Sequence, residues 1–291
     1  MRYRPLAPGL PSVSLVGFGG MPLSIQGRPD STTAQAVLHA ALDAGVTLID
    51  TADSYCLATP EMGHNERLIG AALRAWSGPR DRILVATKGG LVRPDGAWEL
   101  DGRPAHLREA CERSLQALGV EQIALYQLHA PDPAGPFEAS VTALAELQRQ
   151  GKLRWIGLSN VNVAQIETAR AIAPIATVQN RLNPFFREAL REGVVAYCGA
   201  QQLGFLAYSP VGGGRLNRKL PDHPVLQRIS ARLRRSPHAI VTAWVLAQGP
   251  TVCAIPGARR VDHALDAAAA ADLVLEAEDL AAIDHAEFDR R

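Results

Sequence analysis

The chain has 291 residues, of which 47% are hydrophobic and 20% are charged. This composition allows a large buried core and argues against a disordered chain. Lys and Arg number 30 against 29 Asp and Glu, so no net charge attracts nucleic acid or an anionic membrane surface. The N-terminus lacks the apolar run of a signal peptide, and no stretch approaches the roughly 20 apolar residues of a membrane span. We therefore expect a cytoplasmic protein without nucleic-acid or membrane partners.

Eight short apolar runs, each ending in polar or glycine residues, predict buried parallel strands. They are SVSLVGFGG from Ser12, TLID from Thr47, ILVATK from Ile83, IALYQLH from Ile123, WIGLSN from Trp155, ATVQN from Ala176, LGFLAYS from Leu203 and TVCAIP from Thr251. Amphipathic stretches such as those from Ser31, Leu107, Glu138 and His238 separate the runs and indicate helices. Eight strand–helix units, with no second set of elements, predict one α/β domain over residues 1–291 that folds as a (β/α)8 TIM barrel.

Several residues predict where helices and connections begin and end. Ser31 or Thr32 is expected to cap the first helix, and left-handed glycines are expected after four helices. These glycines are Gly45, Gly119, Gly151 and Gly249. The long connections 89–104 and 209–224 both follow a strand, which puts them on the face where barrel active sites lie. The four scattered cysteines form no CxxC pair, so we expect reduced thiols and no metal site.

Four side chains with reactive chemistry stand at successive strand ends. Asp50 closes TLID, Lys88 closes ILVATK and His129 closes IALYQLH, while Tyr55 follows Asp50 in the segment DTADSY. Each alone is equally compatible with a cap, a packing residue or a solvated charge, but together they suit a barrel active site. In carbonyl reduction Tyr55 would donate the proton, Lys88 paired with Asp50 would stabilise the tyrosinate, and His129 would orient the substrate oxygen. This chemistry requires no metal.

The sequence resembles the aldo-keto reductase family over nearly its whole length. The motifs GFGGMPLS, DTADSY with GHNERLIGAAL, ATKGG, QLHAPD, GKLRWIGLSN, VQNRLNP, LAYSPVGGG and IPGARR occur in the family's order. The GHNERLIG segment and the short C-terminus are similar to bacterial, pyridoxal-reductase-like members. The resemblance implies Tyr55 as general acid, with Asp50, Lys88 and His129 completing a catalytic tetrad.

The resemblance also implies a set of cofactor-binding positions. Ser159, Asn160 and Gln179 match residues that hydrogen-bond the nicotinamide carboxamide, and Tyr208 matches the aromatic residue that stacks on the nicotinamide ring. Backbone groups of the glycine-rich connection can approach a pyrophosphate, and the adenosine end falls after the last strand. These further positions are Ser209, Pro210, Val211, Gly212, Gly214, Ile255, Gly257, Arg259, Arg260, His263 and Asp266.

Arg259 and Arg260 favour NADP(H) over NAD(H), because guanidinium groups clamp an adenosine 2'-phosphate. NAD(H) is not excluded. The family's acid–Asn pair is here Asp266 with Ala267, and its basic residue is His263, so the adenine contacts depart from the usual pattern. The chain lacks a GxGxxG motif after the first strand, and cofactor binding therefore depends on the barrel.

Met21, Leu23, Trp98 and Leu216 are the predicted apolar wall of the substrate pocket. With no long C-terminal loop to close it, we expect an open site for a small aldehyde or ketone, in a monomer or a homo-oligomer. Two alternatives remain at this stage. One is a redox-sensing or regulatory barrel that binds NADP(H) with little turnover. The other is a lyase or aldolase that uses Lys88 as a Schiff-base nucleophile.

Overall fold

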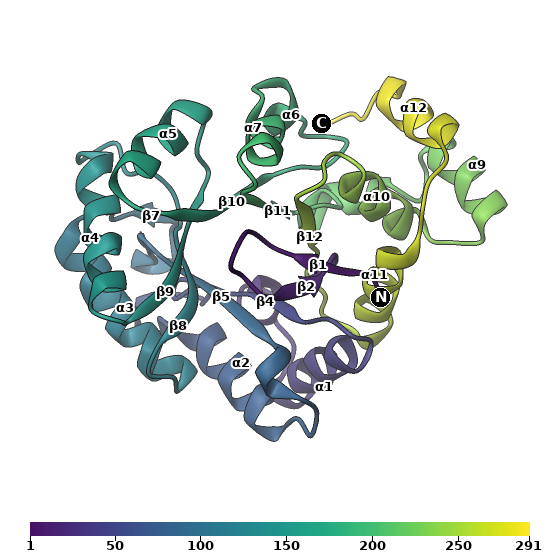
Figure 1. Cartoon of the computed structure of the whole chain (residues 1–291). Coiled ribbons are helices and arrows are strands. Elements are labelled where there is room, and N and C mark those ends of the chain that lie inside the picture. Colours follow the sequence, from purple (N-terminus) through teal and green to yellow (C-terminus); the bar gives the residue numbers. More distant parts are fainter.

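A computed structural model describes all 291 residues and contains a central ring of eight parallel strands (Figure 1). The strands are β3 (Phe18–Gly19), β4 (Leu48–Asp50), β5 (Leu84–Gly89), β8 (Ile123–Leu128), β9 (Leu153–Ser159), β10 (Ile175–Arg181), β11 (Gly204–Tyr208) and β12 (Val252–Ile255). Their order in the sheet follows the chain from β3 to β12. A parallel bridge between Val16 and Ala254 joins the two ends of the sheet. The predicted (β/α)8 barrel is thus confirmed.

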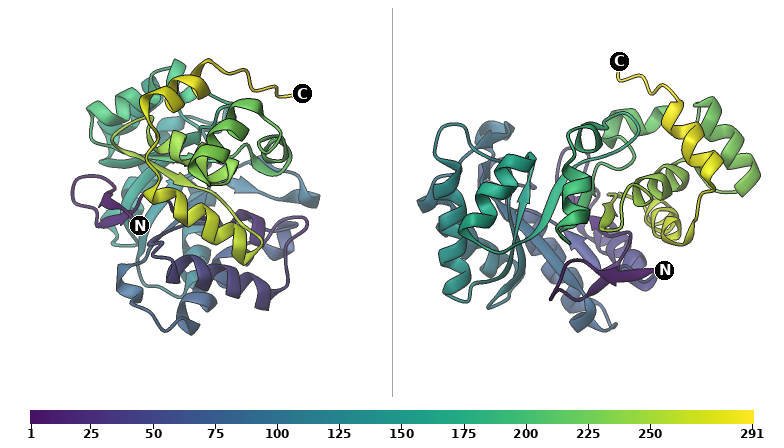
Figure 2. Two further views of the ribbon diagram at one scale, coloured as in Figure 1. Left: turned by 90° about the vertical axis from the view of Figure 1, so that its right-hand side faces the viewer. Right: turned by 45° about the horizontal axis from the view of Figure 1, so that its top comes forward.

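Helices surround this ring on its outer side (Figures 1 and 2). They are α1 (Ser31–Asp43), α2 (His64–Ala75), α3 (Pro104–Leu118), α4 (Phe137–Arg149), α5 (Val163–Ile172), α6 (Glu188–Arg191), α7 (Val194–Ala200), α8 (Gly213–Leu216), α9 (Pro224–Leu233), α10 (Pro237–Leu246), α11 (Val261–Ala269) and α12 (Ala277–His285). The main apolar core lies between the strands and these helices. None of the helices combines the length and apolar character needed to cross a bilayer.

Helix α10 is buried on all sides, which its continuous apolar sequence requires. Helix α9 packs against it, α12 packs against α9, and the Trp244 indole N–H donates a 2.9 Å hydrogen bond to Asp284 of α12. The C-terminal stretch of the chain is therefore part of the barrel's outer layer rather than a free tail.

An antiparallel hairpin of β1 (Tyr3–Pro5) and β2 (Ser12–Ser14) covers the amino end of the barrel. The hairpin's Leu6, Leu10 and Val13 pack with Leu48 and Leu125 of the barrel interior. In Figure 1 it crosses the centre of the ring. The expected single strand from Ser12 to Gly20 is wrong in this respect, since its first part pairs with β1. The apolar plug leaves the carboxyl end of the barrel for polar chemistry.

Two expectations about helix ends are corrected. Asp30, not Ser31 or Thr32, caps α1, because its Oδ1 accepts the Thr33 amide at 2.9 Å; such a cap is worth about 1 kcal/mol. Gly45, Gly119 and Gly151 have positive φ as expected, whereas Gly249 does not. Helix α10 already ends at Leu246, with Ala247 in right-handed geometry as its cap.

The two long connections are both partly ordered into secondary structure. The first contains a small hairpin of β6 (Leu91–Val92) and β7 (Glu99–Leu100), which follows the carboxyl end of β5. The second contains α8 and a short 3-10 helix, Asn217–Lys219, after the end of β11. Both stand on the same end of the barrel as the polar strand ends.

Candidate active site

Lys88 is the centre of a buried hydrogen-bond network at the carboxyl end of the barrel. Its side chain is 0% exposed. The Nζ atom donates to Asp50 Oδ2 at 2.6 Å, to the Thr51 carbonyl at 2.8 Å and to the Tyr55 hydroxyl at 2.9 Å. An ammonium group has three N–H donors, so every one of them is used. The strand pairing of β4 with β5 places Asp50 and Lys88 on neighbouring strand ends.

Asp50 is also bonded through its second oxygen. Oδ1 accepts from Gln179 at 2.7 Å and from Gln127 at 3.3 Å. Gln127 was not predicted from the sequence, although it stands two residues before His129 on β8 and alternate strand residues share a face. With both oxygens bonded, the carboxylate is held in a fixed orientation toward Lys88.

Tyr55 and His129 lie side by side next to the network. Their rings meet edge to face, with centroids 5.7 Å apart. Burial, reinforced by the negative charge of Asp50, raises the pKa of the Tyr55 phenol well above its usual value. Burial and the charge of Lys88 lower the pKa of His129 well below its usual value. At neutral pH the site therefore offers a protonated phenol and a neutral imidazole, both of which can donate to a carbonyl oxygen.

This balance differs from the expectation that Lys88 would make Tyr55 acidic. The Lys88 charge is paired with Asp50, and burial is the largest cause of the raised pKa of the Tyr55 phenol. Burial also lowers the pKa of Lys88 itself. The pKa values of Tyr55, Lys88 and His129 are thus shifted by burial first and by neighbouring charges second.

A second buried polar group lies behind the tetrad and was not predicted. Neither carboxyl oxygen of Asp53 has a hydrogen-bond partner, and the Tyr126 hydroxyl has none. Glu66 accepts only from the Thr87 hydroxyl, at 2.5 Å. Burial and the nearby Glu66 raise the pKa of Asp53 well above its usual value. This side chain therefore favours the neutral carboxyl form.

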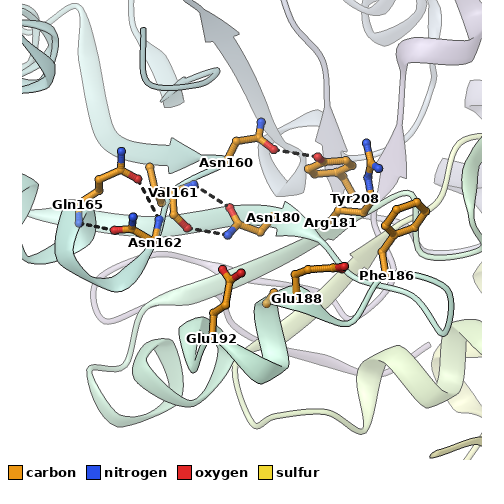
Figure 3. Close-up of a pocket in the computed structure, with 11 residues that line it drawn as sticks. Asn160, Val161, Asn162, Gln165, Asn180, Arg181, Phe186, Glu188, Glu192 and Tyr208 are labelled. Atoms are coloured by element: carbon orange, nitrogen blue, oxygen red, sulfur yellow. Dashed lines mark hydrogen bonds between the residues drawn. The ribbon is translucent and has the colours of Figure 1, made fainter. Parts of the chain in front are cut away.

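The residues assigned to the nicotinamide by resemblance lie together on β9, β10 and β11. Asn160 Nδ2 donates to the His129 carbonyl at 2.9 Å, and its Oδ1 accepts from the Tyr208 hydroxyl at 2.8 Å (Figure 3). Ser159 Oγ accepts from the same Asn160 amide at 3.1 Å. Asn160 and Ser209 both have positive φ, a backbone geometry that is uncommon outside glycine, although asparagine tolerates it, and that occurs often at functional sites.

A cavity of about 380 Å³ opens beside this group, between the ends of β9 and β10 and the helices α5 and α6. Figure 3 shows Asn160 and Tyr208 on its upper side and the carboxylates of Glu188 and Glu192 on its lower side. None of the four tetrad residues lines it. Asn160 therefore contacts both this cavity and, through the His129 backbone, the tetrad.

The residues expected at the adenosine end are on one surface but have partners within the protein. Arg259 donates to the carbonyls of Pro22 and Gln26 at 3.0 and 2.6 Å. Arg260 is exposed and forms a two-pronged ion pair with Asp262, at 3.0 and 2.9 Å. Asp266 accepts from the Ser236 hydroxyl at 2.5 Å.

The remaining expected cofactor residues lie in or beside the connections that follow β11 and β12. Ser209, Pro210, Val211 and Gly212 form the turn from β11 into α8, with Gly212 at φ +91°, and Gly214 lies in α8 itself. Ile255 ends β12, and Gly257 packs so closely on Pro22 that a side chain would collide with it. His263 is exposed on α11. All of these lie at the carboxyl ends of β11 and β12.

The expected apolar wall is only partly present. Trp98 is 46% exposed and meets the Tyr55 ring edge to face, with centroids 6.3 Å apart. Met21 is half-buried in a 3-10 turn after β3. Leu23 is 1% exposed and packs with Phe18 and Ile69 in a core cluster, and Leu216 is buried in the main core. Leu23 and Leu216 are therefore core residues here rather than parts of an open wall.

Residues 15–287 match the sequence model of the Aldo/keto reductase family. The chain belongs to this family. An uncharacterized oxidoreductase of Schizosaccharomyces pombe is 34% identical to this aldo/keto reductase over 277 residues, which cover 94% of the chain and 86% of the relative. The aldo-keto reductase str7 of Strobilurus tenacellus is 33% identical over 93% of the chain and 88% of its own length.

Solved structures of similar proteins cover nearly the whole barrel. The glycerol dehydrogenase of Gluconobacter oxydans has a TM-score of 0.83 and 29% identity, over 96% of this aldo/keto reductase and 93% of its own chain. An aldo/keto reductase from Klebsiella pneumoniae, in complex with NADP and acetate, has a TM-score of 0.81 and 27% identity over 98% and 95% of the two chains. These relatives, with the family match, make the protein an oxidoreductase.

Proposed function

We propose that this chain reduces aldehydes or ketones to alcohols, with NADPH as the hydride source and Tyr55 as the proton donor. The observation that carries the proposal is the hydrogen-bonded series from Asp50 through Lys88 to Tyr55, at 2.6 and 2.9 Å. It ends on a protonated phenol beside a neutral imidazole, which is the pair of donors that a developing alkoxide requires.

The choice of cofactor is supported by the donor set around the barrel mouth. Hydroxyl and amide groups of Ser159, Asn160 and Gln179 match a carboxamide, and the half-buried Tyr208 offers an aromatic face to a flat ring. The 2'-phosphate would lie against Arg259 and Arg260. A solved relative from Klebsiella pneumoniae holds NADP. When bound, NADPH supplies the hydride that the protein's own side chains cannot.

Each tetrad residue then has a defined task. The substrate oxygen accepts hydrogen bonds from Tyr55 Oη and from the His129 ring, which orients the carbonyl carbon toward the hydride donor. As negative charge develops on that oxygen, Tyr55 transfers its proton. Lys88 stabilises the resulting tyrosinate through its 2.9 Å contact, and Asp50 holds Lys88 in place. Because all three Lys88 donors are engaged, a Schiff-base role for Lys88 is disfavoured.

The test is NADPH oxidation with a panel of carbonyl compounds, beginning with 4-nitrobenzaldehyde and pyridoxal. Tyr55→Phe should lower kcat/KM by about 10²- to 10⁴-fold, the usual range for general-acid catalysis, and should leave the NADPH dissociation constant nearly unchanged. Near-normal turnover by this variant would refute the role of Tyr55. Tight NADPH binding without turnover of any carbonyl by the wild type would instead identify a regulatory barrel.

A further inference from the structure

Arg93 is a buried cation at the edge of the proposed active site that has no counter-ion. It follows β6 in the first long connection and is 0% exposed. Its Nη2 donates to the Leu57 carbonyl at 3.2 Å, while Nε and Nη1 have no hydrogen-bond partner. No carboxylate forms a salt bridge with it. A guanidinium group removed from water normally requires such partners.

The Arg93 guanidinium group stacks on the indole ring of Trp98. The guanidinium carbon lies 3.6 Å from the centre of the indole ring. The same indole meets Tyr55 edge to face at 6.3 Å. Trp98 is itself 46% exposed, so a partly exposed side chain contacts both Arg93 and the predicted proton donor. Arg93 is therefore one side chain away from Tyr55.

The Trp98 contact does not replace an ion pair. A cation–π interaction is weaker than the desolvation of a guanidinium group, which amounts to several kcal/mol. Burial accordingly lowers the pKa of Arg93, although the group stays charged. Free N–H groups remain on both edges of the guanidinium, since Nη2 has a second hydrogen. Such an edge matches the two oxygens of a carboxylate or the oxygens of a phosphate.

We propose that Arg93 binds an oxyanion of the substrate, so that this reductase prefers aldehydes and ketones that carry a carboxylate or phosphate group. The inference rests on the proposed function and specifies its substrate class. The carbonyl would lie at Tyr55 and His129, and Trp98 would move aside or pack on the substrate body. The anion would complete the coordination of Arg93 that the protein leaves open.

Two matched substrate pairs test this and separate the two anions. 4-Formylbenzoate is compared with its methyl ester, and pyridoxal 5'-phosphate with pyridoxal. The readout is the ratio of kcat/KM for the anionic over the neutral member. We expect Arg93→Met to lower this ratio by about 10- to 100-fold, mainly through KM, because charge-assisted contacts to the bound substrate are lost. Arg93→Lys should lose less, since it keeps the charge without the fork.

Arg80→Met is the control, because it removes an exposed arginine near the amino end of β5. It should leave the ratio unchanged. Equal wild-type use of both members of each pair, or an equal loss for both in Arg93→Met, would overturn the role of Arg93 while the reductase function stands. If the wild type reduces nothing, calorimetric titration with benzoate still decides: binding lost only in Arg93→Met supports the anion site, and no binding to the wild type overturns it.

Discussion

The cations of the proposed site differ in how fully the protein bonds them. We call the buried pair Lys88 and Asp50 the floor of the site, and the outer residues Arg93 and Arg260 its rim. On the floor, Lys88 has all three donors bonded within the protein, and Asp50 is bonded through both oxygens. On the rim, Arg93 has free N–H groups, and Arg260 is tied to its neighbour Asp262. A cation that the protein saturates can set protonation and geometry but cannot take a ligand. A cation left open, or paired only at the surface, can.

The largest effect is expected on the floor. Lys88→Met leaves Asp50 as a buried, uncompensated carboxylate, so the variant should lose about 3–5 kcal/mol of unfolding free energy. It should also lose about 10³-fold or more in kcat/KM, because Tyr55 loses the group that stabilises its anion. Urea denaturation and steady-state kinetics measure the two losses.

The double variant Asp50→Asn with Lys88→Met is the control for that prediction. It should recover part of the stability, since no buried charge remains, but none of the activity. If Lys88→Met alone kept the wild-type stability, Asp50 would take up a proton at little cost in free energy. The ion pair with Lys88 would then contribute less to stability than its geometry indicates.

Next in size is the loss of the adenosine-end arginines. Arg259→Ala combined with Arg260→Ala should weaken NADPH binding about 10- to 100-fold and NADH much less, because only NADPH has the 2'-phosphate. Fluorescence titration measures both constants. Asp262→Asn removes the ion-pair partner of Arg260 and should therefore strengthen the binding of NADPH relative to that of NADH. An equal loss of affinity for NADPH and NADH would show that Arg259 and Arg260 do not bind the 2'-phosphate.

Asp53 is the exception to the complete hydrogen bonding of Lys88 and Asp50. It lies behind the tetrad, and neither of its carboxyl oxygens has a hydrogen-bond partner. Its pKa is raised in the folded state, so the native protein keeps a proton that the unfolded chain releases. Stability contributed in this way is complete below the unfolded pKa of about 4 and declines as the pH rises toward the folded pKa.

Asp53→Asn should therefore stabilise the protein more at about pH 8 than at about pH 5, by about 1 kcal/mol. Glu66→Gln should show the same sign with a smaller size, because the Thr87 hydroxyl already bonds Glu66. Parallel stability curves for Asp53→Asn and the wild type would show that Asp53 is solvated or paired in solution.

The sequence predicts the regular strands and the residues at their ends better than the irregular connections. The barrel and the positions of Asp50, Lys88 and His129 could be predicted because each closes an apolar strand, and strand ends share one face. Tyr55 could be predicted from its distance to Asp50. The joining contacts could not, since Gln127 in a strand gives no sign that its amide reaches Asp50 across the barrel.

The connections were harder for physical reasons. The hairpin β1–β2 has three-residue strands and a proline, so it carries almost no periodicity. Leu23 is an apolar residue beside the active-site face, and only the packing of α1 and α2 shows that it is buried. Arg93 immediately precedes a Pro–Asp–Gly turn, where an arginine is usually solvated. Its burial depends on Trp98, five residues later, folding back over it.

The smallest effect is expected for the stability of a variant at Arg93. Replacing Arg93 by methionine removes an unpaired buried charge, which is stabilising, but it also removes the hydrogen bond to the Leu57 carbonyl and the contact with Trp98. Because these contributions oppose each other, the unfolding free energy should change by less than about 1 kcal/mol. Lys88→Met, by contrast, replaces an equally buried cation that is fully bonded. Measuring both variants under one set of conditions compares the two cations directly. A loss for Arg93→Met as large as that for Lys88→Met would mean that Arg93 already has a partner in solution, and that its donors are not open to a substrate.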